Sequence, residues 1–245
     1  MVFTERELER YDRQIRLPNF GVEGQRKLKT AKVLVAGVGG LGTAAALYLA
    51  AAGVGRLMLV DKEVVELSNL NRQILYTTND LGKPKAKVAA ERLSSLNPEI
   101  SIEALMVEIN EENVSEIIKG CNVVVDGQDN YKTRYALNDA CIIQRIPFVH
   151  ASVHAYEGRL MTILPGKGPC YRCIVPVPPP EEGGFPVLGT VPGTISTLQA
   201  TEAIKIVLGI GKLYVGRMLI YDALEMMFYE VKVERNPECP SCGLL

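Results

Sequence analysis

The chain has 245 residues, of which 47% are hydrophobic and 22% are charged, and its formal net charge is −1. These values are typical of a globular protein with a well-buried core, and they exclude the strongly basic surface that attracts nucleic acid or an acidic membrane. No apolar run reaches the length of a membrane span, and the charged N-terminus does not resemble a signal peptide. We therefore expect a cytoplasmic protein.

The first 150 residues alternate between short apolar runs and segments with helical spacing. Residues 4–29 are polar and helical in pattern, with a break at Pro18–Gly21. Strands are then predicted at 32–38, 56–60, 100–107, 122–126 and 147–150. Helices are predicted between successive strands, at 41–52, 85–96, 111–118 and 131–144. Such alternation indicates a parallel sheet joined by right-handed crossovers.

The pattern changes after residue 150. Residues 152–164 predict antiparallel strands around Glu157-Gly158, and a loop rich in Pro and Gly follows at 174–193. The remaining predicted elements are a helix at 193–208 and strands at 217–221 and 226–233. The expected fold class is α/β, with a Rossmann-like parallel sheet that is extended by antiparallel strands in the C-terminal part.

A glycine-rich turn follows the first predicted strand. Its glycines are Gly37, Gly39, Gly40 and Gly42, which fit the pattern G-x-G-x-x-G between a strand and a helix. Glycines let the backbone approach phosphate, and the N-terminus of the following helix offers free N–H groups to an anion. Asp61 ends the next strand, roughly 20 residues later, where a carboxylate accepts hydrogen bonds from ribose. Alone, these features predict nucleotide binding and favour an NAD-dependent oxidoreductase.

The residues after Asp61 favour ATP instead. Ser68–Gln73 brings amides and the guanidinium of Arg72 close behind the ribose carboxylate, and Lys85 follows shortly. Asp126–Asn130 contributes two carboxylates at the carboxyl end of the fourth parallel strand, the edge where open α/β sheets bind ligands. Each residue alone could be a solvated charge or a helix cap. Together they suit a triphosphate with magnesium, because cations neutralise phosphate and a carboxylate binds the metal.

Four of the six cysteines form two C-x-x-C pairs. They are Cys170 and Cys173, and Cys239 and Cys242. In a reducing compartment such pairs indicate metal rather than disulfides, and four thiolates make a closed structural zinc site. A redox C-x-x-C opens a helix after a strand, whereas Cys170 is predicted to lie in a turn. The other cysteines, Cys121 and Cys141, are expected to be core residues, and His150 and His154 are expected to be structural.

The motifs together resemble those of the ThiF/MoeB/HesA family, the prokaryotic relatives of ubiquitin-activating enzymes, and its MoeB-like members in particular. Besides the glycine loop, Asp61 and the cysteine pairs, the matching stretches are RYDRQ at 10–14, SNLNRQ at 68–73, GKPKA at 82–86, DGQDN at 126–130 and TEAIK at 201–205. The resemblance implies ATP- and magnesium-dependent adenylation of the C-terminal glycine of a ubiquitin-fold sulfur carrier or modifier, with release of pyrophosphate.

The resemblance also implies roles for individual residues. The glycine loop and Asp61 would bind the nucleotide. The triphosphate would be held by Asn69, Arg72 and Lys85, and Asp129 would coordinate magnesium. These roles make Arg72, Lys85 and Asp129 candidate catalytic residues.

Arg13 is the fourth candidate catalytic residue, because it matches an arginine that reaches the phosphates of a neighbouring subunit in the family. This match implies a homodimer. We expect one adenylation domain over 1–245, made of a helical arm (1–30), a nucleotide-binding half (31–150) and a half that binds the carrier and zinc (151–245).

One departure from the family pattern is informative. Several relatives carry a cysteine in the loop that corresponds to residues 174–201, where it takes over the activated carboxylate. This chain has no cysteine between Cys173 and Cys239, and its matching stretch is Glu181–Phe185. We therefore expect an enzyme that stops at the acyl-adenylate.

Other functions stay open on the sequence alone. One is an NAD-dependent oxidoreductase built on the same loop, and another is an adenylating relative that acts on tRNA or a small molecule. A catalytically silent binding protein is disfavoured because all four candidate catalytic residues are retained. The sequence does not distinguish a carrier of thiamine biosynthesis from one of molybdopterin biosynthesis, and it does not name the sulfur donor.

Overall fold

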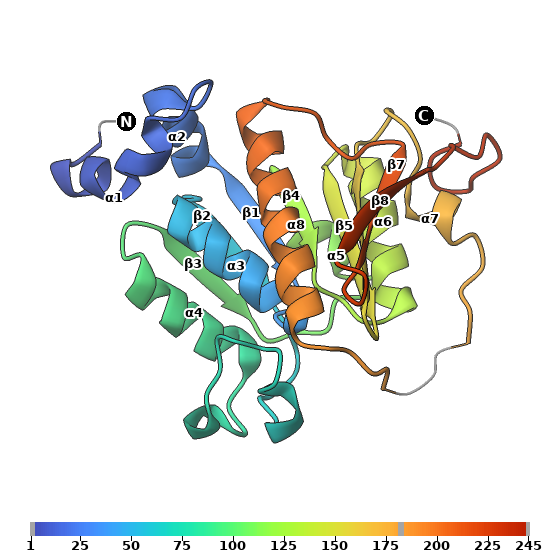
Figure 1. The fold of residues 1–245 in the computed structure, drawn as a ribbon, viewed down its shortest axis with the longest axis horizontal. Helices are drawn as coiled ribbons and strands as arrows, with labels where there is room; N and C mark the ends of the chain where they lie inside the picture. Colours follow the sequence, from blue (N-terminus) through green and yellow to red (C-terminus); the bar gives the residue numbers. More distant parts are fainter. Residues whose placement is uncertain (1–2, 181–183, 244–245) are drawn as a thin grey trace.

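A computed structural model describes residues 3–180 and 184–243. Its centre is a sheet with the strand order β3-β2-β1-β4-β5-β6-β7-β8 (Figure 1). The strands are β1 (Lys32–Ala36), β2 (Arg56–Val60), β3 (Ser101–Leu105), β4 (Val123–Asp126), β5 (Phe148–His154), β6 (Glu157–Ile163), β7 (Arg217–Asp222) and β8 (Met227–Lys232). Strands β1 to β5 are parallel, and β6 to β8 are added antiparallel. The predicted fold class is confirmed.

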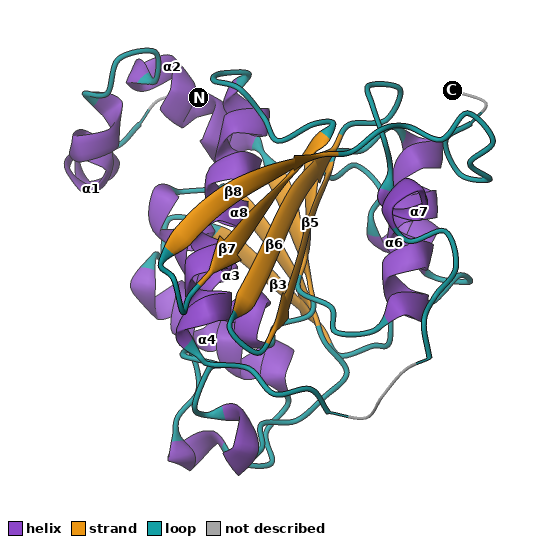
Figure 2. Cartoon of the chain, turned by 45° about the vertical axis from the view of Figure 1, so that its right-hand side comes forward, coloured by secondary structure: helices purple, strands orange, loops and turns teal. Residues whose placement is uncertain are grey.

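Helices cover both faces of this sheet (Figure 1, Figure 2). They are α1 (Glu5–Ile15), α2 (Gly21–Thr30), α3 (Gly40–Ala52), α4 (Lys85–Leu96), α5 (Val114–Ile117), α6 (Tyr131–Gln144), α7 (Tyr171–Ile174) and α8 (Thr190–Leu208), with 3-10 turns at η1 (Leu67–Asn69) and η2 (Thr78–Asp80). Val123 and Val125 of β4 pack into the core beside α3 and α8, while Val124 packs into the core beside α6. Burial on both faces explains why the parallel strands read as continuous apolar runs.

Among the predicted boundaries that differ from the structure, three have a clear physical reason or a large shift. Helix α5 is a single turn, because the side chain of Asn110 accepts hydrogen bonds from the backbone N–H groups of Glu112 and Asn113 and forms a turn there instead. Strand β5 continues to His154, beyond its predicted end. Helix α8 begins at Thr190, before Pro192, because proline is tolerated in the first helical turn, where its missing N–H has no partner to lose.

The helical arm, α1 and α2, packs at the end of the sheet where the parallel strands begin (Figure 1). Gln14 Nε2 donates to the carbonyl of Ala52, the last residue of α3, at 2.7 Å. Asn97, which follows α4, donates from Nδ2 to the hydroxyl of Tyr11 at 2.9 Å. The arm therefore lies at the opposite end of α3 from the glycine loop. Among the described residues, no helix is both long and apolar enough to cross a membrane.

Candidate active site

A cleft opens at the carboxyl edge of the sheet, where the strand order reverses between β1 and β4. Such a reversal is where open α/β sheets bind ligands. The cleft has an empty volume of about 930 Å³, part of it open to solvent. Its walls come from the segments that follow β1, β2, β3 and β4, together with parts of the C-terminal half. Seven of the predicted site residues line it, namely Gly37, Gly39, Gly40, Asp61, Arg72, Lys85 and Asp129.

The glycine loop packs against the loop that follows β4, backbone on backbone. Gly37 has a φ of +89°, and a Cβ atom at this position would lie 2.7 Å from the carbonyl oxygen of Gly127. A Cβ atom on Gly42 would lie only 1.9 Å from the carbonyl oxygen of Gly37. In contrast, the nearest atom to a Cβ on Gly39 would be Gln73 Nε2 at 3.7 Å, an ordinary contact. The glycines therefore differ in role: Gly37 and Gly42 shape the loop, and Gly39 keeps the cleft clear.

This difference predicts that two alanine substitutions affect different properties, the stability of the fold in one case and ATP binding in the other. Gly42→Ala should destabilise the fold by about 3 kcal/mol or more, because the new methyl group collides with backbone that cannot move aside. Gly39→Ala should leave the melting temperature close to that of the wild type but weaken ATP binding by about tenfold, since it places a methyl group in the cleft. Thermal unfolding and a titration with an ATP analogue measure both effects. A Gly42→Ala variant as stable as the wild type would contradict this account of the loop.

Asp61 connects the glycine loop to the end of β2. Its Oδ2 atom accepts from the Val38 N–H, and its Oδ1 atom accepts from the Glu63 N–H, both at 2.8 Å. Burial raises the pKa of Asp61, although these two hydrogen bonds and the nearby Lys85 oppose the shift. Asp61 lines the cleft, and each of its carboxylate oxygens can accept a further hydrogen bond, so the group can accept from ribose hydroxyls.

Two cations line the cleft near the glycine loop. Lys85 is almost fully buried, and its Nζ atom lies 2.6 Å from Glu63 Oε2. Arg72 is partly exposed, and its Nη1 atom donates to the carbonyl of Ser68 at 2.9 Å and to the side chain of Asn71 at 3.0 Å. Glu63 itself lines the cleft beside Lys85. A bound triphosphate would compete with Glu63 for the ammonium group of Lys85.

The two carboxylates after β4 have different environments. Asp126 is completely buried between Arg134 and His150. Burial would raise its pKa, but these two partners hold the pKa of Asp126 below its ordinary value. Asp129 is exposed at the cleft wall. One alternative from the sequence was that Asp129 serves only to cap the following helix. The cap of α6 is instead Asn130, whose Oδ1 atom accepts from the Thr133 N–H at 2.9 Å. Asp129, and not Asp126, is therefore the carboxylate that can take a metal ion.

Some predicted site residues do not line the cleft. Asn69 is buried in η1, where its Oδ1 atom accepts from the Glu66 N–H at 3.1 Å. Gly42 lies in the first turn of α3, directly after Leu41, which does line the cleft. Arg13 is exposed on α1, in the arm at the far end of α3. A role for Arg13 in catalysis therefore requires a second chain.

Several cleft residues were not identified from the sequence. The polar ones include Glu63, Glu108, Gln128 and Arg134, and the apolar ones include Val153, Phe185, Val187 and Pro192. Gln128 lies inside the recognised stretch DGQDN, and Glu63 lies two residues after Asp61, so the sequence did offer a signal for both of them. The apolar residues come from the C-terminal half, and no local pattern indicates that this part of the chain folds back over the nucleotide loop.

The four paired cysteines meet at a separate place, beside α6 and α7. Their sulfur atoms all lie within 4.8 Å of one another. The Sγ atoms of Cys170 and Cys239 are 3.5 Å apart, as are those of Cys173 and Cys242. Sulfur atoms about 2.3 Å from a tetrahedral metal would be roughly 3.8 Å apart. The donor set and its geometry therefore fit zinc, and this cluster could hold one ion.

One argument that the sequence offered for zinc, the expected turn at Cys170, was wrong. Cys170 does not lie in a plain turn, because it immediately precedes the short helix α7. A cysteine at a helix start also suits redox chemistry, so the argument for metal rests on the meeting of four thiols and not on the local structure of the first pair. The segment is fixed to α6 by Arg172, whose Nη2 atom lies 2.7 Å from Asp139 Oδ2, and Ser241 donates to the same carboxylate at 2.5 Å.

Comparison with known proteins decides among the families that use such a loop. Residues 11–241 match the ThiF family. The chain belongs to the ThiF family. It is 47% identical over 254 residues to a sulfur carrier protein adenylyltransferase of Thermus thermophilus, covering 99% of this chain and 93% of the relative. It is 46% identical to the SAMP-activating enzyme E1 of Haloferax volcanii, covering 97% of this chain and 89% of the relative.

Solved structures agree with this assignment. Escherichia coli MccB with ATP superposes with a TM-score of 0.85 at 26% identity, over 98% of this chain and 75% of that one. MccB is also solved with a form of MccA, and that structure has a TM-score of 0.86 at 25% identity, over 96% of this chain and 74% of that one. The predicted resemblance is confirmed, and the protein is an adenylyltransferase of the ubiquitin-activating type. The family therefore replaces the NAD-dependent oxidoreductase that the glycine loop and Asp61 alone favoured.

Proposed function

We propose that this protein uses ATP and magnesium to adenylate the C-terminal glycine of a ubiquitin-fold sulfur-carrier protein, and that it releases pyrophosphate. The observation that carries the proposal is the composition of the cleft. The glycine loop, the carboxylate of Asp61, the cations Arg72 and Lys85, and the exposed Asp129 all line it. The names of its relatives, a sulfur carrier protein adenylyltransferase and a SAMP-activating enzyme, indicate the class of partner.

The proposed reaction needs positioned charge more than a protein nucleophile. The carboxylate of the partner attacks the α-phosphate, a new C–O–P linkage forms, and the bond to pyrophosphate breaks. Arg72 and Lys85 stabilise the negative charge that develops on the phosphates, and the glycine loop and Asp61 fix the nucleotide in line for attack. Magnesium, which Asp129 would hold, would neutralise further phosphate charge.

A segment over the cleft is suited to guiding an extended tail. Residues 184–189, which we call the crossover segment, lead into α8 across the carboxyl edge of the sheet (Figure 1). Ala155 at the β5–β6 turn donates to the carbonyl of Pro186 at 2.7 Å and accepts from the Leu188 N–H at 3.0 Å. Phe185 and Val187 of this segment line the cleft. These two side chains would place an apolar wall beside the reacting tail of the partner.

The half at 151–245 offers a surface for the body of the partner. Large apolar side chains are exposed along β8 and the turn before it, namely Leu224, Met226, Met227, Phe228, Tyr229 and Val231. The β7–β8 turn lies beside the β5–β6 turn, since Ala223 donates to the carbonyl of Tyr156 at 2.9 Å. An exposed apolar surface of this kind supports a protein-docking site that is continuous with the cleft end of the sheet.

We also propose a homodimer. The arm exposes the apolar side chains of Leu8, Leu17 and Val22 as well as Arg13, which is a surface suited to a second copy. A second copy would bring Arg13 to the phosphates in the partner's cleft. The proposed division of labour is therefore an arm at 1–30 that completes the neighbouring site, a half at 31–150 that binds nucleotide, and a half at 151–245 that binds the carrier and zinc.

The single most informative experiment is ATP–pyrophosphate exchange with each ubiquitin-fold protein of the host, with and without its terminal Gly-Gly. Exchange is expected with at least one such protein and should disappear when the two glycines are removed. The MccB structures, one of which contains MccA, make a peptide substrate the second candidate. Exchange with a short peptide and with no ubiquitin-fold protein would replace the first proposal by the second. The same assay distinguishes a thiamine-pathway carrier from a molybdopterin-pathway carrier.

A further prediction concerns the product. No cysteine lies between Cys173 and Cys239, although residues 181–183 of the matching stretch are outside the described part of the chain. The activated carrier should therefore remain an acyl-adenylate, and denaturing gels run without thiol should show no covalent adduct between enzyme and carrier. A band at the summed mass that disappears on adding thiol would contradict this prediction. Radiolabelled AMP that co-purifies with the carrier is the positive control.

A further inference from the structure

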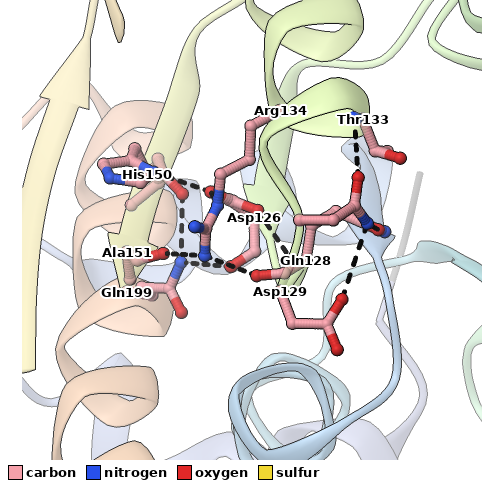
Figure 3. A network of polar contacts seen from close by, with 10 residues as sticks. Asp126, Gln128, Asp129, Thr133, Arg134, His150, Ala151 and Gln199 are labelled. Atoms are coloured by element: carbon pink, nitrogen blue, oxygen red, sulfur yellow. Dashed lines mark hydrogen bonds and ion pairs between the residues drawn. The ribbon is translucent and has the colours of Figure 1, made fainter. Parts of the chain in front are cut away.

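A cluster of buried charged side chains lies directly behind Asp129 (Figure 3). Asp126 is 0% exposed, and its Oδ2 atom lies 3.1 Å from Arg134 Nε and 2.7 Å from His150 Nδ1. Arg134 is itself buried. A buried ion pair adds little stability compared with well-packed apolar side chains, because desolvation offsets the attraction between the charges. Stability alone therefore does not explain this pair.

The ion pair holds the turn that carries Asp129. Arg134 Nη2 donates to the carbonyl of Gln128 at 2.5 Å and to the carbonyl of Ala151 at 3.1 Å (Figure 3). Asp126 Oδ1 accepts from the Gln128 N–H at 2.9 Å. The carbonyl of Gln128 belongs to the peptide group that joins it to Asp129. The backbone on the N-terminal side of Asp129 is thus fixed by Asp126 and Arg134 acting together.

The C-terminal side of Asp129 is fixed independently, since Asn130 caps α6 through its hydrogen bond with the Thr133 N–H. Among the described residues, the carboxylate of Asp129 has only one long side-chain hydrogen bond, at 3.5 Å from Asn130 Nδ2. Figure 3 shows the Asp129 side chain pointing away from Arg134 and His150. The backbone of Asp129 is therefore held on both sides while its carboxylate stays available to a ligand.

We propose that Arg134 is a positioning residue, which acts through Asp126 and the Gln128 carbonyl to aim the Asp129 carboxylate at the metal–triphosphate complex. This inference rests on the proposed magnesium role of Asp129. Arginine suits the task because its planar group donates in several fixed directions at once, whereas lysine has one compact ammonium group. A misplacement of about 1 Å in such a site can cost about a hundredfold in rate, so a residue that acts by placing the Asp129 carboxylate can still govern the reaction.

The test uses Mn²⁺ in place of magnesium, bound to the full-length enzyme with a non-hydrolysable ATP analogue, and electron paramagnetic resonance to measure free Mn²⁺. In Arg134→Lys, Mn²⁺ affinity in the ternary complex should fall by about ten- to a hundredfold, as for other residues that orient a metal ligand. Affinity for the analogue in EDTA should change little, because the glycine loop, Asp61, Arg72 and Lys85 are unchanged and the substitution keeps a positive charge at position 134 of the cleft wall. A loss of packing alone would lower both affinities together.

Two further variants keep the test decisive. The double variant Asp126→Asn, Arg134→Met removes both buried charges at once and should fold, yet it releases the Gln128 carbonyl and should weaken Mn²⁺ as Arg134→Lys does. The matched control is Arg172→Lys, which alters an arginine that pairs with Asp139 beside the thiol cluster and outside the cleft. The control should bind Mn²⁺ as the wild type does.

A double-mutant cycle separates this inference from the function on which it rests. Asp129→Asn should weaken Mn²⁺ strongly, and adding Arg134→Lys to it should have no further effect, because the second change acts only through the first. If Asp129→Asn binds Mn²⁺ normally, the proposed magnesium role fails and this inference fails with it. If Asp129→Asn weakens Mn²⁺ while both Arg134 variants do not, or if Arg134→Lys weakens Mn²⁺ equally in the Asp129→Asn background, only the positioning role is overturned.

Discussion

Replacing Arg13 with alanine should lower ATP–pyrophosphate exchange by roughly two to three orders of magnitude, the effect of removing one fixed donor to developing charge. The size of this effect would be surprising from a single chain. Arg13 lies on α1, and the neighbouring Gln14 contacts the end of α3 that is farthest from the glycine loop. Among the described residues, the Arg13 side chain has no hydrogen bond or ion pair. It is therefore free to reach a second chain.

Subunit mixing provides the decisive version of this experiment. Arg13→Ala and Asp129→Asn should each be inactive alone, but a hybrid dimer contains one cleft with an intact Asp129 and an Arg13 from the other chain. Mixing the two proteins should therefore restore exchange to a measurable fraction of the wild-type rate. Arg16→Ala is the matched control, since Arg16 lies just beyond α1 and pairs with Asp12 at 2.9 Å within its own chain. Full activity of Arg13→Ala, or no recovery in purified hybrids, would contradict a shared site.

Much of the fold could be predicted because the parallel strands are buried on both faces. Val33 to Ala36 and Val123 to Val125 are fully buried, so their runs have no polar interruption. Glycines predicted some of the helix ends. Gly53, for example, directly follows α3 and adopts a φ of +84°. Within the candidate site, the glycine loop and Asp61 were predictable for the same reason, since their roles depend on local strand, turn and helix geometry.

The remainder of the site depends on contacts between distant segments, which local patterns do not report. The ion pair of Lys85 with Glu63 links positions on either side of a long loop, and Arg134 reaches back across the turn to Asp126. Asn69 also depends on its partner, because this motif residue, predicted to hold phosphate, is buried with its Oδ1 atom accepting from the Glu66 N–H. The type of a residue and its place in a motif indicate what its side chain could bind. The side chains and backbone groups that it contacts in the fold decide whether it is available to the ligand.

Loss of a zinc ion from the four-cysteine cluster should lower the stability of the protein substantially. A zinc ion at the thiol cluster would connect Cys170 to Cys239, which are 69 residues apart. Treated as a cross-link that restricts the unfolded chain, this connection contributes about 4 kcal/mol. For a chain of this length, a loss of that size corresponds to about 10 °C in melting temperature. The effect should be large even though the cluster lies outside the cleft.

The comparison of Cys239→Ala with Cys121→Ala isolates this contribution, because both remove the same atoms but only Cys239 belongs to the cluster. Fresh wild-type protein and Cys121→Ala should contain about one zinc per chain by elemental analysis, since a four-thiolate site is closed. Cys239→Ala should contain little zinc and melt about 10 °C below the wild type. Its C-terminal segment should also exchange amide hydrogens faster, while α7 stays ordered because Arg172 and Asp139 still hold it to α6. Equal zinc content and stability in both variants would show that the four thiols do not form a metal site.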